Sequence, residues 1–510
     1  MKHLPGNSVK DAVTDHPATV GSFRSAFSSW GRFRTEIFGG LVTSLALIPE
    51  VISFSIVEGV DPRVGLFTSF VMCVAIAFTG GRPAMVTAAA GSVALVMAPL
   101  VKNHGVDYLV PAVLLAGMIQ IALGLGGVAN LMRFIPRSVM NGFVNALAIL
   151  IFLAQLQHVI HVPWMVYVLV AISLAIMVVW PRVNRVIPGP LVAIVVVTAL
   201  AILGHIDVPT VRDQGELPHG VPSLIIPDVV FGFRHFGVIA PYALGAAIVG
   251  LIESLLTAKL VDDLTDQHSD KTRESWGLGI ANVASAFVGG QGGCAMIGQT
   301  MINVRHAQAR TRLSTLLAGV FLLVLVISLG EIVGQIPMAA LVAVMFVVAF
   351  STMDWHSVDP RTLWRMPLSE TAVMSVTIIA TVVTNNLAVG VVCGVVGASV
   401  MFVRRVAHMV TVEQVDPSSE TSNTSRYRVR GQLFFASSND VVFSFNYTDP
   451  AETIEIDVSE AEVWDSSAVS ALESIAHKYR QRGKRVQVVG ATGASLERLR
   501  RLSSLTIVEK

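Results

Sequence analysis

The stretch GGQGGCAMIGQT, residues 289–300, interrupts an apolar chain with five glycines and no charged residue. It follows one apolar segment and precedes residues with a helical pattern. Glycine tolerates tight turns and lets another backbone or a ligand approach closely. The stretch therefore predicts a turn that opens a short helix within the apolar region.

The composition places most of the chain in a lipid bilayer. Of its 510 residues, 53% are hydrophobic and 14% are charged, whereas soluble proteins carry about 25% charged residues. A net charge of +1 gives no bulk attraction for polyanions, so no nucleic-acid partner is expected. The cysteines Cys73, Cys294 and Cys393 lie in apolar stretches without metal-ligand spacing, and we interpret them as packing residues.

About fourteen apolar segments separated by polar loops fill residues 36–410. A helix that crosses the bilayer needs about 20 residues, and segments 86–101 and 294–305 are too short. A helix that ends inside the membrane is tolerated where its exposed backbone lines a cavity, and we expect this of both segments. The segments span 36–59, 64–80, 86–101, 109–128, 138–157, 162–180, 188–204, 239–262, 275–289, 294–305, 311–330, 336–353, 368–384 and 387–410.

Lysine and arginine gather in the loops that follow even-numbered segments. The loops after odd-numbered segments hold only Arg63, Lys102, Arg212 and Arg234. Because cytoplasmic loops are enriched in these residues, both termini are expected in the cytoplasm of a multi-pass plasma (inner) membrane protein.

Four regions follow from the pattern along the chain. They are a cytosolic tail over 1–35 with an interfacial helix near 23–33, a transmembrane transport domain over 36–410, a Ser/Thr-rich linker over 411–426, and a cytosolic α/β domain over 427–510. In the last region, apolar alternation predicts strands at 427–433, 453–458 and 485–489, and helices at 466–482 and 494–502.

The two halves of the membrane region repeat one another. Segment 1 carries LIPEVISFS with Glu50, and segment 8 carries LIESLLTA with Glu253. Two segments later come GGRPAMVTAAAG (80–91) and GGCAMIGQT (292–300). The offset of seven spans is odd, so the repeats, about 36–204 and 239–410, have opposite orientations. Matching short, glycine-interrupted segments are typical of a transporter's binding site at the bilayer midplane.

Two helices that begin inside the membrane would point unpaired N–H groups and positive dipole ends at one another. Such a site suits a small anion without lysine or arginine. The alternative is tight helix packing through small residues. The residues expected to line the anion site are Thr87, Ala88, Ala89, Ala90, Gly293, Cys294, Ala295 and Met296.

Two acids lie in otherwise apolar segments, Glu50 and Glu253. A charged group at that depth costs at least about 2.5–3.5 kcal/mol, so each is a functional candidate and a candidate proton carrier. Pairing with a neighbouring polar group, or for Glu50 capping a kink at Pro49, is the structural alternative. Gln299 and Thr300 follow the second turn and are candidates for contact with substrate or with a gate.

The chain resembles the SulP family of anion transporters with a C-terminal STAS domain. The matching stretches are FGGLVTSLALIPEVISFSIVEGVDPRVGLF (38–67), GGRPAMVTAAAGSVALVMAPL (80–100), IVGLIESLLTAKLVDDLTDQHSDKTRE (248–274), GLGIANVASAFVGGQGGCAMIGQTMINV (277–304), RTRLSTLLAGVFLL (310–323) and IPMAALVAV (336–344). The resemblance implies a 7+7 inverted repeat, with a core of segments 1–4 and 8–11 and a gate of segments 5–7 and 12–14. It also implies elevator-like movement of the core, and commonly a homodimer.

The resemblance also bears on the coupling ion. In a sodium-coupled bicarbonate relative, an Asp and a Thr four residues later contribute to the sodium site, and Glu253 and Thr257 match that spacing. The acid here is Glu, and Ala90 stands where that relative has Thr in segment 3. We therefore favour proton coupling over sodium coupling or plain exchange, with no other cofactor.

In the C-terminal domain, Asp465-Ser466-Ser467 follows a predicted strand and opens a helix. STAS domains of bacterial stress regulators are phosphorylated on a serine there, which makes Ser466 a candidate, with a helix N-cap as the alternative. We expect the domain to serve assembly or to bind a cytosolic regulatory partner.

The expected function is secondary active transport of a small anion, with sulfate the family's commonest label and bicarbonate or a dicarboxylate as further candidates. A nucleobase permease of the same fold class and an uncoupled channel-like or motor protein are the alternatives. No nucleophile–base pair, HExxH, Walker A loop or dinucleotide fingerprint is present, so we do not expect an enzyme.

Overall fold

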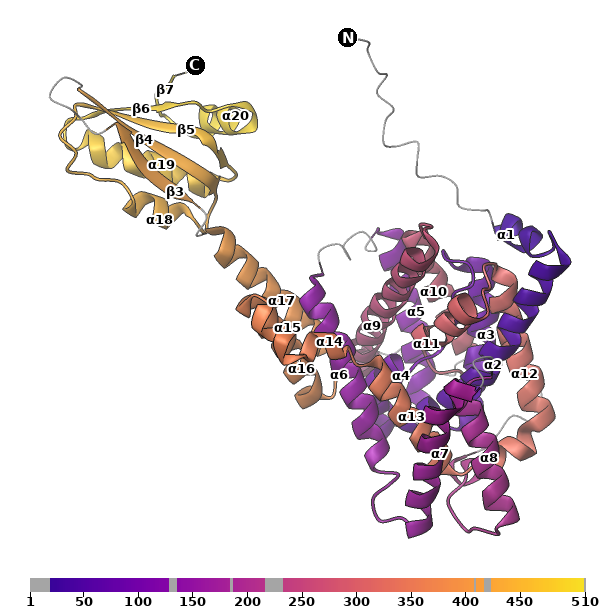
Figure 1. Cartoon of the computed structure of the whole chain (residues 1–510). Coiled ribbons are helices and arrows are strands. Elements are labelled where there is room, and N and C mark those ends of the chain that lie inside the picture. The colour runs from indigo at the N-terminus through magenta and orange to yellow at the C-terminus, as the bar shows by residue number, and fades with distance from the viewer. Residues whose placement is uncertain are drawn as a thin grey trace. The chain divides into compact units, whose positions relative to one another are not determined.

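The computed structural model describes residues 19–127, 135–183, 187–215, 233–407, 410–416 and 423–508. The chain divides into two compact units, Met1–Val395 and Val396–Lys510 (Figure 1). In the residues that the structure describes, the first unit is built of helices and two very short strands, and the second is built around a five-stranded sheet.

Each of the fourteen predicted segments contains a helix. Among the described residues, eight helices are long and apolar enough to cross a membrane, and three shorter helices are also apolar. The helices of the segments are α2 (Trp30–Glu58), α3 (Pro62–Thr79), α4 (Gly91–His104), α5 (Leu109–Leu125), α6 (Arg137–Leu156), α7 (Trp164–Val183), α8 (Gly189–Leu203), α9 (Phe233–Thr265), α10 (Lys271–Ala286), α11 (Ile297–Met301), α12 (Arg312–Gly334), α13 (Met338–Thr352), α16 (Leu368–Thr384) and α17 (Leu387–Ala407).

Shorter elements connect these helices. They are the 3-10 turns η1 (Val106–Tyr108) and η3 (Val211–Gln214), the π-helical turn η4 (Ile302–His306), and the helices α14 (Trp355–Val358) and α15 (Pro360–Arg365). The turn η4 continues directly from α11, so the helical stretch that follows the glycine-rich turn runs from Ile297 to His306.

The second half of the predicted tail over 1–35 is more helical than expected, since the sequence predicts only an interfacial helix near 23–33. Residues 19–26 form α1 (Thr19–Ala26), and α2 begins at Trp30 behind the N-cap Ser29. The Ser22 hydroxyl accepts a hydrogen bond from the Arg312 backbone N–H (3.2 Å), and the Phe23 ring packs against Phe78 at 5.4 Å. These contacts with α12 and α3 hold α1 in place, whereas residues 1–18 lie outside the described part of the chain.

The end of α3 is fastened by charged side chains from α10 and α12. The Arg273 guanidinium donates to the Phe78 and Thr79 carbonyl oxygens (2.8 and 3.1 Å). The Arg312 guanidinium donates to the Gly80 carbonyl oxygen (2.6 Å). Buried Glu274 accepts from the Gly81 and Arg82 backbone N–H groups (2.7 and 3.1 Å). The glycine turn that follows α3 is thereby fixed, and with it the short strand that comes next.

The two glycine-rich turns meet as an antiparallel strand pair, β1 (Thr87–Ala89) and β2 (Gly293–Ala295). Thr87 pairs with Ala295, Ala88 with Cys294, and Ala89 with Gly293. Every residue of the pair is buried. The antiparallel pairing brings corresponding parts of the two repeats together with opposite directions.

The second unit has strands β3 (Thr411–Asp416), β4 (Thr424–Leu433), β5 (Thr453–Val463), β6 (Arg485–Val489) and β7 (Ile507–Val508), with helices α18 (Ser438–Phe443), α19 (Ser466–Arg480) and α20 (Gly493–Leu502). The sheet order is β3-β4-β5-β6-β7, with β3 antiparallel to β4 and the other pairs parallel. Apolar residues of β4, β5, β6 and α19 share one core. Within it, burial and a hydrogen bond donated to Asp449 (2.7 Å) raise the pKa of Tyr427 to about 12.

The predicted linker over 411–426 is also corrected. Residues 411–416 form β3, and β4 begins at Thr424. The reason is that Val412 packs against the core of the sheet while β3 pairs with β4. Residues 417–422 lie outside the described residues.

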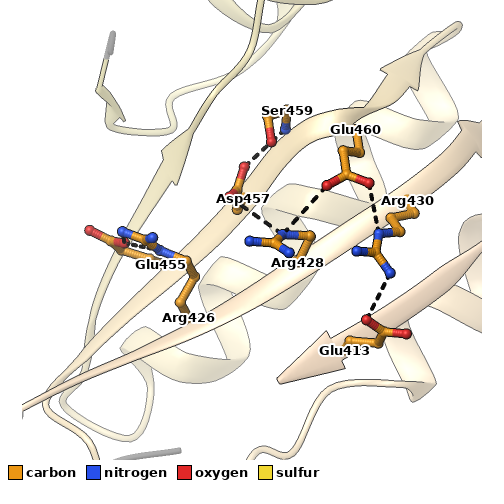
Figure 2. Close-up of polar contacts among 8 residues, drawn as sticks. All are labelled: Glu413, Arg426, Arg428, Arg430, Glu455, Asp457, Ser459 and Glu460. Atoms are coloured by element: carbon orange, nitrogen blue, oxygen red, sulfur yellow. Dashed lines mark hydrogen bonds and ion pairs between the residues drawn. The ribbon is translucent and has the colours of Figure 1, made fainter. Parts of the chain in front are cut away.

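Figure 2 shows the polar side chains between β3, β4 and β5. Arg426 pairs with Glu455 (2.7 Å), and Arg430 with both Glu460 (2.7 Å) and Glu413 (2.9 Å). The arginines alternate with the core-facing residues of β4, so they share one face of the strand. Opposite charges on neighbouring strands contribute roughly 0.2–1 kcal/mol per pair, which favours this strand register.

In the first unit, α5 and α10 cross with their backbones in close approach. A carbon atom added at Gly117 would lie 2.8 Å from the Gly279 carbonyl oxygen, and one added at Gly279 would lie 2.6 Å from the Gly117 carbonyl oxygen. Small residues at a crossing let membrane helices pack this closely. Near this crossing, Asn282 of α10 binds β2, and Gln120 of α5 accepts a hydrogen bond from Asn282.

Replacing Gly117 by alanine should lower the thermal unfolding temperature of the detergent-solubilised chain, because overpacking of this kind costs about 1–3 kcal/mol. Gly237→Ala in α9 is the matched control, since nothing lies within 4 Å of a carbon added there. The measurement is a melting curve of the purified protein. Equal melting temperatures for wild type and both variants would show that the α5–α10 contact does not limit stability.

Candidate functional site

A cavity of about 120 Å³ lies next to the strand pair. Its walls come from α2, α4, α9 and α11 on the one hand, and from α6 and α13 on the other. These two sets of helices correspond to the expected core and gate. The lining residues are Glu50, Phe54, Gly91, Ser92, Phe143, Val144, Leu147, Ile151, Glu253, Leu256, Met296, Ile297, Gly298, Gln299, Val348, Ser351 and Thr352.

Two helices begin at this cavity. Helix α4 starts at Gly91 after the extended residue Ala90, and α11 starts at Ile297 after the extended residue Met296. The first backbone bonds that close each helix run from Ala94 N–H to the Ala90 oxygen (2.9 Å) and from Thr300 N–H to the Met296 oxygen (3.0 Å). The N–H groups of the first turns therefore have no intrahelical acceptor. The first turns of both helices line the cavity, as the repeated motif predicts.

Polar side chains from α10 and α9 bind β2, and one from α5 supports them. The Asn282 side chain accepts from Gly293 N–H (2.9 Å) and donates to the Gly293 carbonyl oxygen (3.1 Å), so it pairs with the strand as another backbone would. The Asn282 amide also donates to Gln120 (2.8 Å). The Ser254 hydroxyl accepts from Ala295 N–H (3.0 Å). Sequence reasoning missed all three supporting residues.

Strand β1 is held in the same manner from α3 and α11. The Ser69 hydroxyl accepts from Ala89 N–H (3.2 Å), and the Cys73 thiol donates to the Thr87 carbonyl oxygen (3.1 Å). The Thr300 hydroxyl accepts from Val86 N–H (3.0 Å). Thr300, predicted as a substrate or gate contact, thus binds the backbone of the other repeat and is not among the residues that line the cavity.

Both predicted acids reach the cavity. The Glu253 side chain accepts hydrogen bonds from the Ser92 hydroxyl and from the Cys294 thiol (3.0 Å for the latter). Thr257, predicted to act with Glu253, donates to the Glu253 backbone oxygen (2.8 Å). Its hydroxyl is therefore satisfied within α9, and Thr257 is not among the cavity-lining residues.

The predicted anion-binding residues fall into two groups. Met296 lines the cavity, as do Gln299 and the two acids. The remaining seven lie directly behind the lining, buried in the strand pair or at the residue before α4: Thr87, Ala88, Ala89, Ala90, Gly293, Cys294 and Ala295. Their backbone leads into α4 and α11 and sets the starts of these two helices side by side.

Gln299 is the lining residue with unused hydrogen-bonding capacity. Its side chain is 1% exposed and lies beside the Glu50 carboxyl. Its amide interacts with the Glu50 carboxyl, but neither the amide oxygen nor the amide nitrogen has full hydrogen-bond geometry to any residue that the structure describes. Because buried polar groups are nearly always paired, this side chain points to a polar occupant of the cavity.

The sequence did not single out Ser92, although it follows the small-residue run directly, or the gate-side residues Phe143, Ser351 and Thr352. In the second unit, Ser466 is exposed and occupies the first position of α19. The N-cap is Asp465, whose carboxylate accepts from Ala468 N–H (2.9 Å). Phosphorylation of Ser466 stays a prediction.

Comparison with known proteins adds the following. The sulfate permease family model matches residues 33–163 and 156–377, and the STAS domain model matches residues 418–509. The chain is 46% identical over 474 residues to the Bacillus subtilis protein named "Putative sulfate transporter YbaR", covering 93% of this chain and 98% of that protein. It is 24% identical over 524 residues to "Bicarbonate transporter BicA" of Picosynechococcus sp., covering 92% and 90% of the two chains.

Two solved structures share the fold. The murine Slc26a9 anion transporter in its inward-facing state superposes with a TM-score of 0.79 at 18% identity, covering 95% of this chain and 90% of that one. The transmembrane domain of a cyanobacterium bicarbonate transporter, BicA, gives a TM-score of 0.63 at 24% identity, covering 72% and 98%. From its sequence and the models that match it, this chain belongs to the sulfate permease family and carries a STAS domain after its membrane region.

Proposed function

We propose that this member of an anion-transporting family is a secondary active transporter that binds a small anion in the cavity and carries a proton with it. Sulfate is the first candidate substrate, since the 46% identical relative is named for sulfate, and bicarbonate is the second. A dicarboxylate is a third candidate. Movement of the helices around α4 and α11 against α6 and α13 would expose the cavity alternately to the two sides of the membrane.

The observation that carries the proposal is the unsatisfied polar lining of a small cavity. The first turns of α4 and α11 offer backbone N–H donors without a partner among the described residues, and the Gln299 amide beside Glu50 has no partner of full hydrogen-bond geometry there. The cavity, at about 120 Å³, is well below the roughly 300–1,000 Å³ of pockets for drug-sized ligands. A solute of a few heavy atoms that accepts several hydrogen bonds fits this lining, as sulfate and bicarbonate do.

Electrostatics favour a proton as the companion ion. None of the residues that line the cavity is lysine or arginine, while two, Glu50 and Glu253, are acids. An ionised carboxylate in so small a space repels an anion, and a proton bound to it removes that repulsion. Anion and proton therefore bind with positive linkage, and each raises the affinity for the other. The Thr257 hydroxyl is used within α9, and Ala90 offers no side-chain oxygen, so sodium has less support.

Assembly and topology belong to the same proposal. Cytoplasmic termini follow from the distribution of lysine and arginine, and a homodimer follows from the family resemblance. The STAS domain would then lie in the cytoplasm, where a regulatory partner can reach it. An uncoupled channel-like pathway remains the functional alternative, and it would carry current without accumulating substrate.

Glu253→Gln should still bind the anion but lose its accumulation against a gradient, because the amide cannot take up and release the coupling proton. Uptake of labelled sulfate and bicarbonate into proteoliposomes under an imposed pH gradient measures this. The expected fall in the accumulation ratio is about tenfold or more. Glu331→Gln is the control, since Glu331 is exposed on α12 and does not line the cavity. Undiminished pH-driven accumulation by Glu253→Gln would remove this residue from the coupling role.

Gly298→Leu should abolish uptake without unfolding the protein. Gly298 lines the cavity, and nothing lies within 4 Å of a carbon added there, so a leucine side chain would occupy the space of the substrate. Gly298→Ala adds a single methyl group and should retain most of the uptake. Both variants are compared for initial uptake rate and for melting temperature. Wild-type rates in a folded Gly298→Leu protein would place the substrate elsewhere.

A further inference from the structure

One oxygen of Glu253 is held by two side-chain donors. Its Oε2 accepts from the Ser92 hydroxyl and from the Cys294 thiol, the latter at 3.0 Å. The Ser92 Oγ and the Cys294 Sγ also contact each other at 3.4 Å. Glu253, Ser92 and Cys294 are 7%, 1% and 0% exposed. The three groups form a closed cluster at the edge of the cavity.

The donors come from the two opposed repeats. Ser92 is the second residue of α4, just after β1, and Cys294 is the middle residue of β2. Cys294 pairs with Ala88 of β1, so the strand pairing sets the two donors next to one another. Glu253 reaches them from α9. One carboxyl is thereby in contact with the start of α4 and with the strand that precedes α11.

Hydroxyl and thiol groups can each donate or accept a hydrogen bond by rotating one bond, which ammonium and guanidinium groups cannot do. An ionised Glu253 accepts from both partners. When a proton is bound to Oε2, that oxygen becomes a donor, and one of the partners must turn round and accept. The cluster can therefore follow a change of charge without leaving a buried polar group unpaired.

We propose that Ser92 and Cys294 are positioning residues that hold Glu253 in both of its protonation states during transport. The inference rests on the proposed proton coupling at Glu253. In each cycle, a proton from water on one side of the membrane forms an O–H bond with the carboxylate. The same bond breaks on the other side, and the proton returns to water. Ser92 and Cys294 neither gain nor lose a proton overall.

The effect of pH on other ionisable groups near the cluster has to be distinguished from its effect on Glu253. Among the residues that line the cavity, Glu50 of α2 is the other titratable side chain, and α4, α6, α11 and α13 contribute none. Cys294 is titratable itself and is part of the cluster. Measurements of pH dependence are therefore paired with the same measurements in a Glu50→Gln background.

The first test is the infrared S–H stretch of the full-length protein in lipid nanodiscs. The Cys294 band is isolated as the difference between wild type and Cys294→Ala. It should lie at the low frequency of a thiol bonded to a carboxylate, and it should shift when pH changes the charge of Glu253. In Glu253→Gln, the shift with pH should vanish. Cys73 serves as the internal reference, because its thiol donates to the Thr87 carbonyl oxygen, which does not titrate.

The second test is accumulation of labelled sulfate under a pH gradient. Ser92→Ala and Cys294→Ala should each lower the accumulation ratio about tenfold, because each removes a hydrogen bond to a charged group. Ser92→Thr and Cys294→Ser keep a group that both donates and accepts a hydrogen bond, and these variants should retain most of the accumulation. Cys393→Ala, which changes a cysteine outside the cavity lining, should match wild type.

The inference is overturned if the frequency of the Cys294 band changes neither with pH nor in Glu253→Gln. It is also overturned if Ser92→Ala and Cys294→Ala both accumulate sulfate as wild type does. Failure of the proposed function has a different signature. If sulfate accumulation by the wild type does not depend on the pH gradient, proton coupling is overturned. If the Cys294 band still shifts with the charge of Glu253 in that case, the contact of Glu253 with its two donors stands.

Discussion

The three-residue pairing of β1 with β2 is the constraint on which the rest of the membrane unit depends. Two chain segments from opposite repeats must each stop being helical at the same depth, and their backbones satisfy one another there. Asn282, Ser254 and Ser69 bind backbone groups on the outer edges of the pair. Because of this pairing, α4 and α11 begin side by side, and a cavity with unused donors lies at their first turns.

The cavity combines features that oppose each other electrostatically. Helix starts and the Gln299 amide favour an anion, whereas Glu50 and Glu253 disfavour one unless they are neutral. A site with a fixed arginine would hold an anion regardless of pH. Donors that carry only partial charge, set beside a carboxyl that can change its charge, would give a binding energy that depends on proton occupancy, as the proposed coupled transport requires.

The sequence predicts the fourteen helical segments, the approach of the two glycine turns, and the position of Glu50 and Glu253 inside the membrane region. Each of these features produces a local pattern in the sequence, namely a long apolar run, a glycine cluster, or a charged residue within an apolar run. It could not predict where Thr257 and Thr300 point, since both bind backbone within or across repeats. Asn282 and Ser92 act through contacts with residues far away in the sequence. The sequence predicts a linker where β3 forms, because these residues are mostly polar and the pairing with β4 arises only in the fold.

The arginine contacts at the end of α3 have a mechanical consequence. Arg273 and Arg312 bind the last carbonyl oxygens of α3 from two different helices, and Glu274 binds the two N–H groups that follow. Tilting α3 alone would break several charged hydrogen bonds, and those of Arg312 and Glu274 are buried, which makes their loss costly. In the proposed transport movement, helices α3, α10 and α12 would therefore travel together, and a sliding surface would run outside them.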